Sequence, residues 1–127
     1  MQLNHINLPV PDVKETQAFF ERFFYFTCTA TKGDGVISIL RGKDNFLLVL
    51  NKLDEEKDNA YPRDFHIGFM LDTPEQVSAI YSRLKESGID TGREPKKIRD
   101  SFGFYFIAPG NFMVEISCPV VQDNGEL

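Results

Sequence analysis

Residues 103–118, GFYFIAPGNFMVEISC, decide how this chain is interpreted, because they read as two apolar strands joined by a tight turn. Aromatic residues occupy alternate positions in the first half, which is typical of a β-strand. The pair Pro109-Gly110 marks the turn. In the second half the large apolar residues alternate again, and Glu115 lies on the opposite face of that strand. A carboxylate in so apolar a strand is costly unless it is paired, hydrogen-bonded or bound to a metal, so Glu115 is a candidate functional residue.

The same pattern of elements occurs twice along the chain. Each copy reads as one strand, one helix and three further strands. The first helix follows an N-cap at Asp12 and extends to about Phe24, and the second begins after Thr73 and stops at Gly88. The strands are expected near residues 3–8, 26–30, 36–40, 46–50, 65–71, 90–97, 102–107 and 112–118. A repeat used only twice indicates an internal duplication and an α+β fold.

The boundaries of the two copies follow from composition. The first module spans about residues 1–51, a polar and charged linker about 52–64, the second module about 65–119 and an acidic tail 120–127. A chain of 127 residues favours one domain with its own core.

Composition also excludes some classes of partner. The net charge of −5 argues against nucleic acid. No apolar run approaches the roughly 20 residues of a membrane span, and the first residues do not resemble a secretory signal. The two cysteines, Cys28 and Cys118, form no CxxC pattern and are interpreted as buried reduced thiols, so we expect a cytoplasmic protein.

The only two histidines, His5 and His66, occupy equivalent positions in the two copies. Alternation along the strands places both on the face away from the helices, together with Glu115. Two imidazoles and a carboxylate on rigid strands are a ligand set of open catalytic sites. We therefore predict one divalent ion, Mn, Fe, Ni or Zn, bound by His5, His66 and Glu115. Taken singly, each residue is more often an ordinary hydrogen-bonded side chain.

Three segments resemble the signature segments of the vicinal oxygen chelate superfamily: LNHINLPVPD (3–12), FHIGFMLDTPEQV (65–77) and FGFYFIAPGNFMVEI (102–116). That group includes glyoxalase I, extradiol dioxygenases, fosfomycin-resistance thiol transferases and bleomycin-resistance binding proteins. The resemblance implies two paired βαβββ modules that form a cup-shaped, partly open mixed β-sheet barrel with the helices outside. It also implies a homodimer, in which sites can be shared between chains.

In this family the metal ligands come from the first and last strands of each module. The matching positions here are His5, Val49, His66 and Glu115. Because Val49 is not a ligand, the set is similar to the three-ligand members rather than to glyoxalase I, which has a fourth protein ligand there. The chain also has no third histidine of the kind that extradiol dioxygenases use as an acid–base catalyst.

Four further residues are predicted at the site. Tyr105 is placed like a substrate-binding tyrosine of the fosfomycin group and, with Glu115, is our candidate for catalysis. Asn7, two residues after His5 on the same face, is a candidate polar contact to substrate, and Met70 and Met113 are candidate apolar walls. A basic run from Arg93 to Arg99 is interpreted as a solvated strand and loop, the other reading being an entrance for an anionic substrate.

Two functions remain open from the sequence. The first is a divalent-metal-dependent enzyme of the glyoxalase/dioxygenase type, a lyase, thiol transferase or dioxygenase, in which the metal stabilises an oxyanion or enediolate on a small oxygenated substrate. The second is a metal-free protein that binds a small molecule such as an antibiotic, as bleomycin-resistance proteins do.

Overall fold

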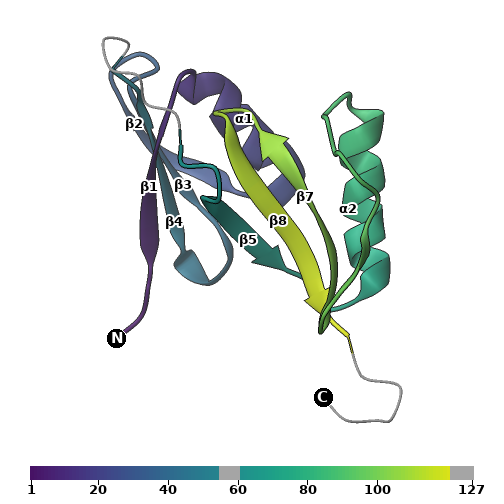
Figure 1. Cartoon of the computed structure of the whole chain (residues 1–127). Coiled ribbons are helices and arrows are strands. Elements are labelled where there is room, and N and C mark those ends of the chain that lie inside the picture. Colours follow the sequence, from purple (N-terminus) through teal and green to yellow (C-terminus); the bar gives the residue numbers. More distant parts are fainter. Residues whose placement is uncertain (55–60, 121–127) are drawn as a thin grey trace. The chain divides into compact units, whose positions relative to one another are not determined.

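The computed structural model describes residues 1–54 and 61–120 of the chain. It has two four-stranded mixed sheets, each with one helix, in the order βαβββ twice (Figure 1). This confirms the predicted α+β class with two βαβββ modules. Each sheet is open rather than closed into a barrel. The chain divides into two compact units, of which the first comprises residues 1–61 and 109–111 and the second the remainder.

The first sheet has the strand order β1-β4-β3-β2. Its strand β1 is parallel to β4, and the other neighbours are antiparallel. A short 3-10 turn, Lys43–Asn45, precedes β4. The elements are β1 (His5–Val10), α1 (Val13–Phe24), β2 (Thr27–Lys32), β3 (Ile37–Arg41) and β4 (Leu47–Lys52).

Helix α1 begins where the sequence predicts, because the Asp12 side chain accepts a hydrogen bond from the backbone N–H of Glu15 at 2.9 Å. It ends at Tyr25, whose left-handed backbone stops the helix. Its aromatic stripe buries Phe19, Phe20 and Phe23. The sheet side of this core consists of fully buried strand residues: Leu8, Val10, Leu40, Leu48 and Leu50.

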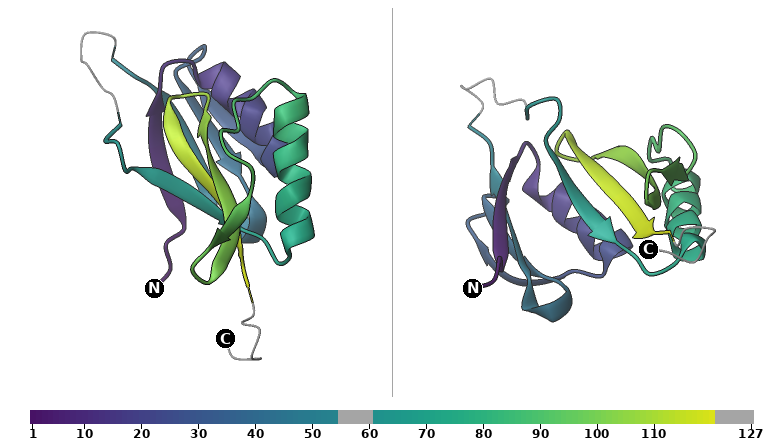
Figure 2. Two further views of the ribbon diagram at one scale, coloured as in Figure 1. Left: turned by 45° about the vertical axis from the view of Figure 1, so that its right-hand side comes forward. Right: turned by 60° about the horizontal axis from the view of Figure 1, so that its bottom comes forward.

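The second sheet has the strand order β5-β8-β7-β6, with β5 parallel to β8 and the other pairs antiparallel. Helix α2 lies along one face of this sheet (Figure 2). The elements are β5 (His66–Met70), α2 (Pro74–Glu86), β6 (Lys96–Ile98), β7 (Ser101–Ala108) and β8 (Phe112–Pro119).

Helix α2 carries the predicted start signal in full. The Thr73 side chain accepts from the backbone of Gln76, and the Gln76 side chain accepts from the backbone of Thr73. The buried face of the helix packs on β7 and β8, where the ring of Tyr81 meets that of Phe104 edge-on at 5.3 Å. The opposite face of the sheet is left free of helices.

Two strand predictions differ from the structure. Residues 90–97 were expected to form a strand, but only Lys96–Ile98 does. The Asp90 side chain accepts from the N–H of Gly92, whose left-handed backbone forms a turn instead. Strand β1 continues through Pro9, which its position at the edge of the sheet permits.

Some sequence predictions fall outside the described residues. Positions 55–60 of the predicted linker and 121–127 of the predicted tail lie there, so the domain boundaries stay predictions. Within residues 1–54 and 61–120, no helix is long and apolar enough to cross a membrane.

We predict that Gly103→Ala destabilises the protein by about 1–3 kcal/mol, because the added Cβ would overlap the backbone oxygen of Ile116 and lie 2.8 Å from the Cβ of Ser117. Gly68→Ala is the matched control. A Cβ there has no neighbour closer than 3.9 Å, so its effect should stay within about 0.5 kcal/mol. The measurement is urea unfolding, and equal losses in the two variants would contradict this account.

We also predict a pH-dependent contribution from Tyr61. Its hydroxyl donates to the backbone oxygen of Pro9 at 2.7 Å, and burial raises its pKa from 10.0 to about 12. A raised pKa means that this contribution is complete below pH 10 and is lost as the pH rises toward 12. Tyr61→Phe should therefore cost about 1 kcal/mol at pH 8 and less at pH 11, measured by urea unfolding at both values. Tyr25→Phe, at a side chain that is 77% exposed, is the control.

Candidate metal and substrate site

The second unit brings His66 and Glu115 together on the helix-free face of its sheet. Strand β5 pairs with β8 so that Gly68 lies opposite Glu115, and His66 lies two residues earlier on the same face. The Nε2 atom of His66 is 3.4 Å from Oε1 of Glu115. Both side chains are partly open to solvent. Two of the three predicted metal ligands are therefore neighbours.

The backbone around His66 determines which ring nitrogen faces Glu115. Its Nδ1 is 3.0 Å from the backbone oxygen of Asp64. A carbonyl oxygen only accepts, so Nδ1 carries a proton, and Nε2 is the atom that faces the carboxylate. An imidazole nitrogen and a carboxylate oxygen placed in this way are both able to ligate one cation.

The first unit holds His5 in the same way. Its Nδ1 lies 2.7 Å from Oδ1 of Asn4, so this ring is also held through Nδ1 and its Nε2 faces outward as a potential ligand. His5 and Asn7 are both exposed on the face of β1 opposite the buried Leu8 and Val10, as the alternation predicted. The register also supports the duplication, since Asn7 pairs with Val49 as Gly68 pairs with Glu115.

Tyr105 lies directly across from Glu115 on the neighbouring strand β7. Its ring meets that of His66 edge-on, with centroids 5.7 Å apart. Burial, then the charge of Glu115 and a hydrogen bond to it, raise the pKa of the Tyr105 hydroxyl. The hydroxyl therefore stays protonated at neutral pH and can act as a hydrogen-bond donor.

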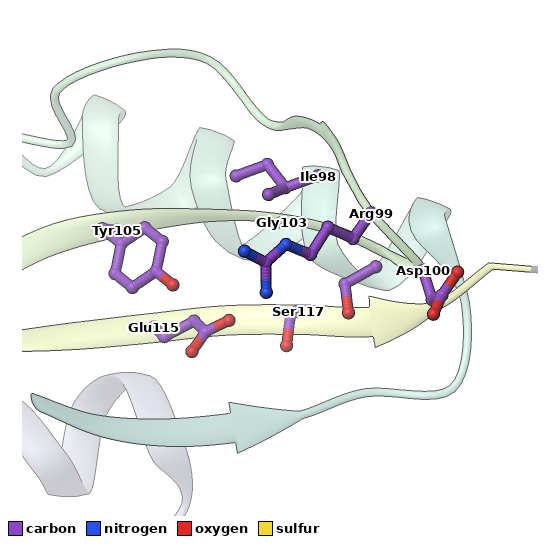
Figure 3. Close-up of a pocket in the computed structure, with 8 residues that line it drawn as sticks. Ile98, Arg99, Asp100, Gly103, Tyr105, Glu115 and Ser117 are labelled. Carbon is purple, nitrogen blue, oxygen red and sulfur yellow. The ribbon is translucent and has the colours of Figure 1, made fainter.

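A pocket of about 440 Å³ lies over these strands, at the end toward the turn between β6 and β7 (Figure 3). Tyr105 and Glu115 are among the residues that line it. The other lining residues are Ile98, Arg99, Asp100, Ser101, Gly103 and Ser117. Sequence reasoning missed Ser117, although it shares the face of Glu115 by strand alternation. It also treated Arg99 only as part of a basic run, because the turn that brings it over the sheet is not readable from spacing.

The two methionines predicted as walls lie on the same face of the second sheet. Met70 on β5 is 74% exposed, and Met113 on β8 is half-buried. Neither is among the residues that line the 440 Å³ pocket. Their role in substrate binding stays a prediction.

The donor atoms of the second unit fit a divalent ion in part. An imidazole nitrogen and a carboxylate oxygen 3.4 Å apart can bind one ion, since such ligands lie roughly 2 Å from zinc. Across residues 1–54 and 61–120, no group of three or more His, Cys, Asp or Glu side chains forms a metal site. His66 and Glu115 are thus two candidate ligands whose donor atoms lie close together, and their binding of a metal and the participation of His5 stay predictions.

Comparison with known proteins adds evidence of kinship. Residues 2–116 match the family model described as Glyoxalase/Bleomycin resistance protein/Dioxygenase superfamily. Among curated proteins, metapyrocatechase of Geobacillus stearothermophilus is 25% identical over 115 residues, which are 91% of this chain and 34% of that protein. The chain therefore spans about a third of the length of this relative.

Solved structures of similar proteins agree with this family match. A structure described as a possible glyoxalase from Bacillus cereus is 40% identical and superposes with a TM-score of 0.82, covering 93% of this chain and 99% of that one. A genomically encoded fosfomycin resistance protein from Listeria monocytogenes has a TM-score of 0.76 at 20% identity, covering 100% of this chain and 98% of that one. The second likeness is one of fold alone.

We predict that Glu115→Gln lowers the pKa of Tyr105, because the charge of the carboxylate is one cause of its raised value. The pKa should stay above the ordinary value, since burial remains. The measurement is a titration of protein with ¹³Cζ-labelled tyrosine after chelator treatment, with Tyr105→Phe to assign the resonance. An unchanged Tyr105 pKa in the Gln variant would show that the two side chains do not interact.

Proposed function

The chain belongs to the glyoxalase/bleomycin resistance protein/dioxygenase superfamily, and from this premise we propose that it is a divalent-metal-dependent enzyme acting on a small oxygenated substrate. The observation that carries the proposal is the contact between His66 and Glu115. The ring nitrogen that faces the carboxylate has its partner nitrogen already bonded to a backbone oxygen, which is the usual arrangement of a metal-binding histidine.

In this proposal His66 and Glu115 hold the ion, and His5 supplies the third ligand. A divalent ion there would act as a Lewis acid that stabilises an oxyanion or enediolate on the substrate. The Nδ1 hydrogen bonds of the two histidines keep each ring in the orientation and tautomer that leave Nε2 free. Glu115 contributes the negative charge that makes the site favour a cation over a neutral occupant.

Tyr105 donates a hydrogen bond to the bound substrate. Its raised pKa keeps the proton on the hydroxyl, and its position across from Glu115 places that proton beside the ligand pair. Of the other residues in the proposal, Asn7 is a polar contact to substrate, and Met70 and Met113 limit the size of the group that the site accepts.

The reaction type is proposed only as far as the residues allow. Val49 stands where a fourth protein ligand would be, so at most three side chains hold the ion and several positions stay open for substrate. The chain has no third histidine to serve as an acid–base catalyst. A lyase, a thiol transferase or a dioxygenase whose proton transfers use Glu115 or Tyr105 is compatible with both facts.

A second candidate is a metal-free protein that binds a small molecule. It is supported by the 440 Å³ pocket, which Tyr105 and Glu115 line and which would receive the ligand. In that case the contact between His66 and Glu115 is a polar pair on the same face of the sheet.

For the protein in the cell, we propose a cytoplasmic homodimer. Support for the dimer comes from the family, whose small members often form dimers. The proposed ligands belong to two compact units, His5 to the first and His66 and Glu115 to the second. A site can therefore draw its two units from one chain or from two.

The metal content of the purified protein separates the two functions. We expect about one divalent ion per chain when the protein is prepared without chelators and measured by inductively coupled plasma mass spectrometry. His66→Ala and Glu115→Gln should each weaken binding at least about tenfold, since even residues that only support a ligand contribute that much. Glu75→Gln, at an exposed carboxylate in the first turn of α2, is the control. Negligible metal, or metal that is unchanged in both site variants, would favour the metal-free protein.

Sharing of sites between chains has its own test. His5→Ala and His66→Ala chains are each expected to lose the ion. If sites are shared, a mixed dimer of the two variants contains one site with all three ligands and regains up to half of the wild-type metal. If each site lies within one chain, the mixed dimer stays empty. Unchanged metal in the His5→Ala protein would remove His5 from the ligand set.

A further inference from the structure

The guanidinium of Arg99 lies over the pocket beside the proposed ligand pair, and no hydrogen bond or ion pair within the described residues engages its positive charge. We propose that Arg99, with the hydroxyls of Ser101 and Ser117, forms a binding subsite for an oxyanion, so that the substrate carries a carboxylate or a phosphonate-type group. This inference rests on the proposed function, because it names the chemical class of the substrate for the same site.

The position of Arg99 follows from a tight hairpin. Ile98 pairs with Ser101, so Arg99 and Asp100 alone connect β6 to β7. The hairpin is fastened to the end of β8, where the N–H of Val120 donates to the oxygen of Asp100 at 2.9 Å. Arg99 has a φ of 54°, a left-handed conformation that is uncommon for a residue with a Cβ. Such a conformation, held by the surrounding strands, is a reason to look for a role.

The side chain of Arg99 lies over the sheet. Figure 3 shows it extending back along β7, so that the guanidinium is near Tyr105, Glu115 and Ser117. Among the described residues, the guanidinium has no hydrogen-bond or ion-pair partner. Arginine stays charged at all physiological pH values, and its planar set of donors matches the oxygens of a carboxylate or phosphonate.

Two hydroxyls complete the subsite. Ser117 on β8 is 8% exposed, and Ser101 lies at the start of β7; both line the pocket with Arg99. Within residues 1–54 and 61–120, neither hydroxyl forms a hydrogen bond, so each is free to donate one to a bound oxyanion. Glycine at position 103, between these side chains, keeps the floor of the pocket open.

Two carboxylates also line the pocket and bear on this proposal. Asp100 lies at the end of the pocket away from Tyr105 (Figure 3). Glu115 lies nearer, and in the proposed function its carboxylate is bound to the ion, whose positive charge offsets its own. The guanidinium therefore remains the positive centre that an anionic group meets in this pocket.

The other cations of the basic run do not line the 440 Å³ pocket. Arg93 and Lys96 line an adjoining hollow of about 260 Å³, which shares Ile98, Gly103 and Tyr105 with that pocket. Lys97 is exposed on β6. The expectation of a solvated face thus describes most of the run, while Arg99 alone of its members lines the 440 Å³ pocket. Arg93, of the same charge and a few residues away, serves as a matched control.

The test is a titration of full-length protein, purified without chelators, with methylphosphonate and, separately, propionate at constant ionic strength, followed by isothermal titration calorimetry. We expect saturable binding of at least one anion by the wild type. Arg99→Gln should weaken it at least about tenfold, because hydrogen bonds between charged groups are the strong ones. Arg99→Lys should bind with intermediate affinity, since lysine lacks the planar fork. Arg93→Gln should stay within about twofold of the wild type.

The two anions and the variants give separate outcomes. Tighter methylphosphonate assigns the subsite to a phosphorus oxyanion, and tighter propionate assigns it to a carboxylate. Absence of saturable binding, or equal losses in Arg99→Gln and Arg93→Gln, would overturn the proposal. Far-UV circular dichroism of each variant checks that the exposed turn still folds, and Arg99→Lys gives a second reading if Arg99→Gln does not.

Metal content distinguishes this proposal from the proposed function. Arg99→Gln is expected to keep the metal content of the wild type, because Arg99 is not a proposed ligand. Anion binding that depends on Arg99 in a protein without a metal site would support the subsite and contradict the metal-dependent enzyme. A metal-loaded protein in which Arg99→Gln has no effect on anion binding would support the metal-dependent enzyme and contradict the subsite.

Discussion

The parallel pairing of β5 with β8 is the constraint on which the candidate site depends. This pairing sets Gly68 opposite Glu115 and leaves His66 one step away on the same face. The carboxylate of Glu115 extends past Gly68, where even an added Cβ would lie 3.9 Å from Oε1. A shift of the register by one residue would turn the carboxylate into the apolar core under α2 and separate the two groups.

The duplicated modules show how one backbone frame can carry different chemistry. The first module repeats the register, with Asn7 opposite Val49 and Ile39 on the next strand. The second has Gly68, Glu115 and Tyr105 at the corresponding positions, which are paired in the same way. Polar and ionisable groups are therefore concentrated on the second sheet, while the first contributes one histidine and its neighbours. Such asymmetry is expected when a duplicated scaffold needs only one site.

On the second sheet, both burial and a neighbouring charge act on the pKa of Tyr105. Tyr105 lies between an acid and partly apolar surroundings, and both raise its pKa. The imidazole of His66 lies 3.4 Å from the same acid. Strands β8 and β7 are hydrogen-bonded on both sides, and β5 is paired with β8. These groups therefore stay near one another without a ligand, which lowers the entropic cost of binding one.

Local sequence signals determined the repeated βαβββ order, both helix starts and the face on which His5, His66 and Glu115 lie, because caps and strand alternation are properties of neighbouring residues. They failed at residues 90–95, where a strand was expected. There the Asp90 side chain accepts a hydrogen bond from the N–H of Gly92 and the backbone forms a turn. Only the tertiary structure decided that His66 contacts Glu115 and that Arg99 lies over the same pocket. Both depend on the pairing of strands that are distant in sequence and on the direction of a two-residue turn, and neither can be read from spacing along the chain.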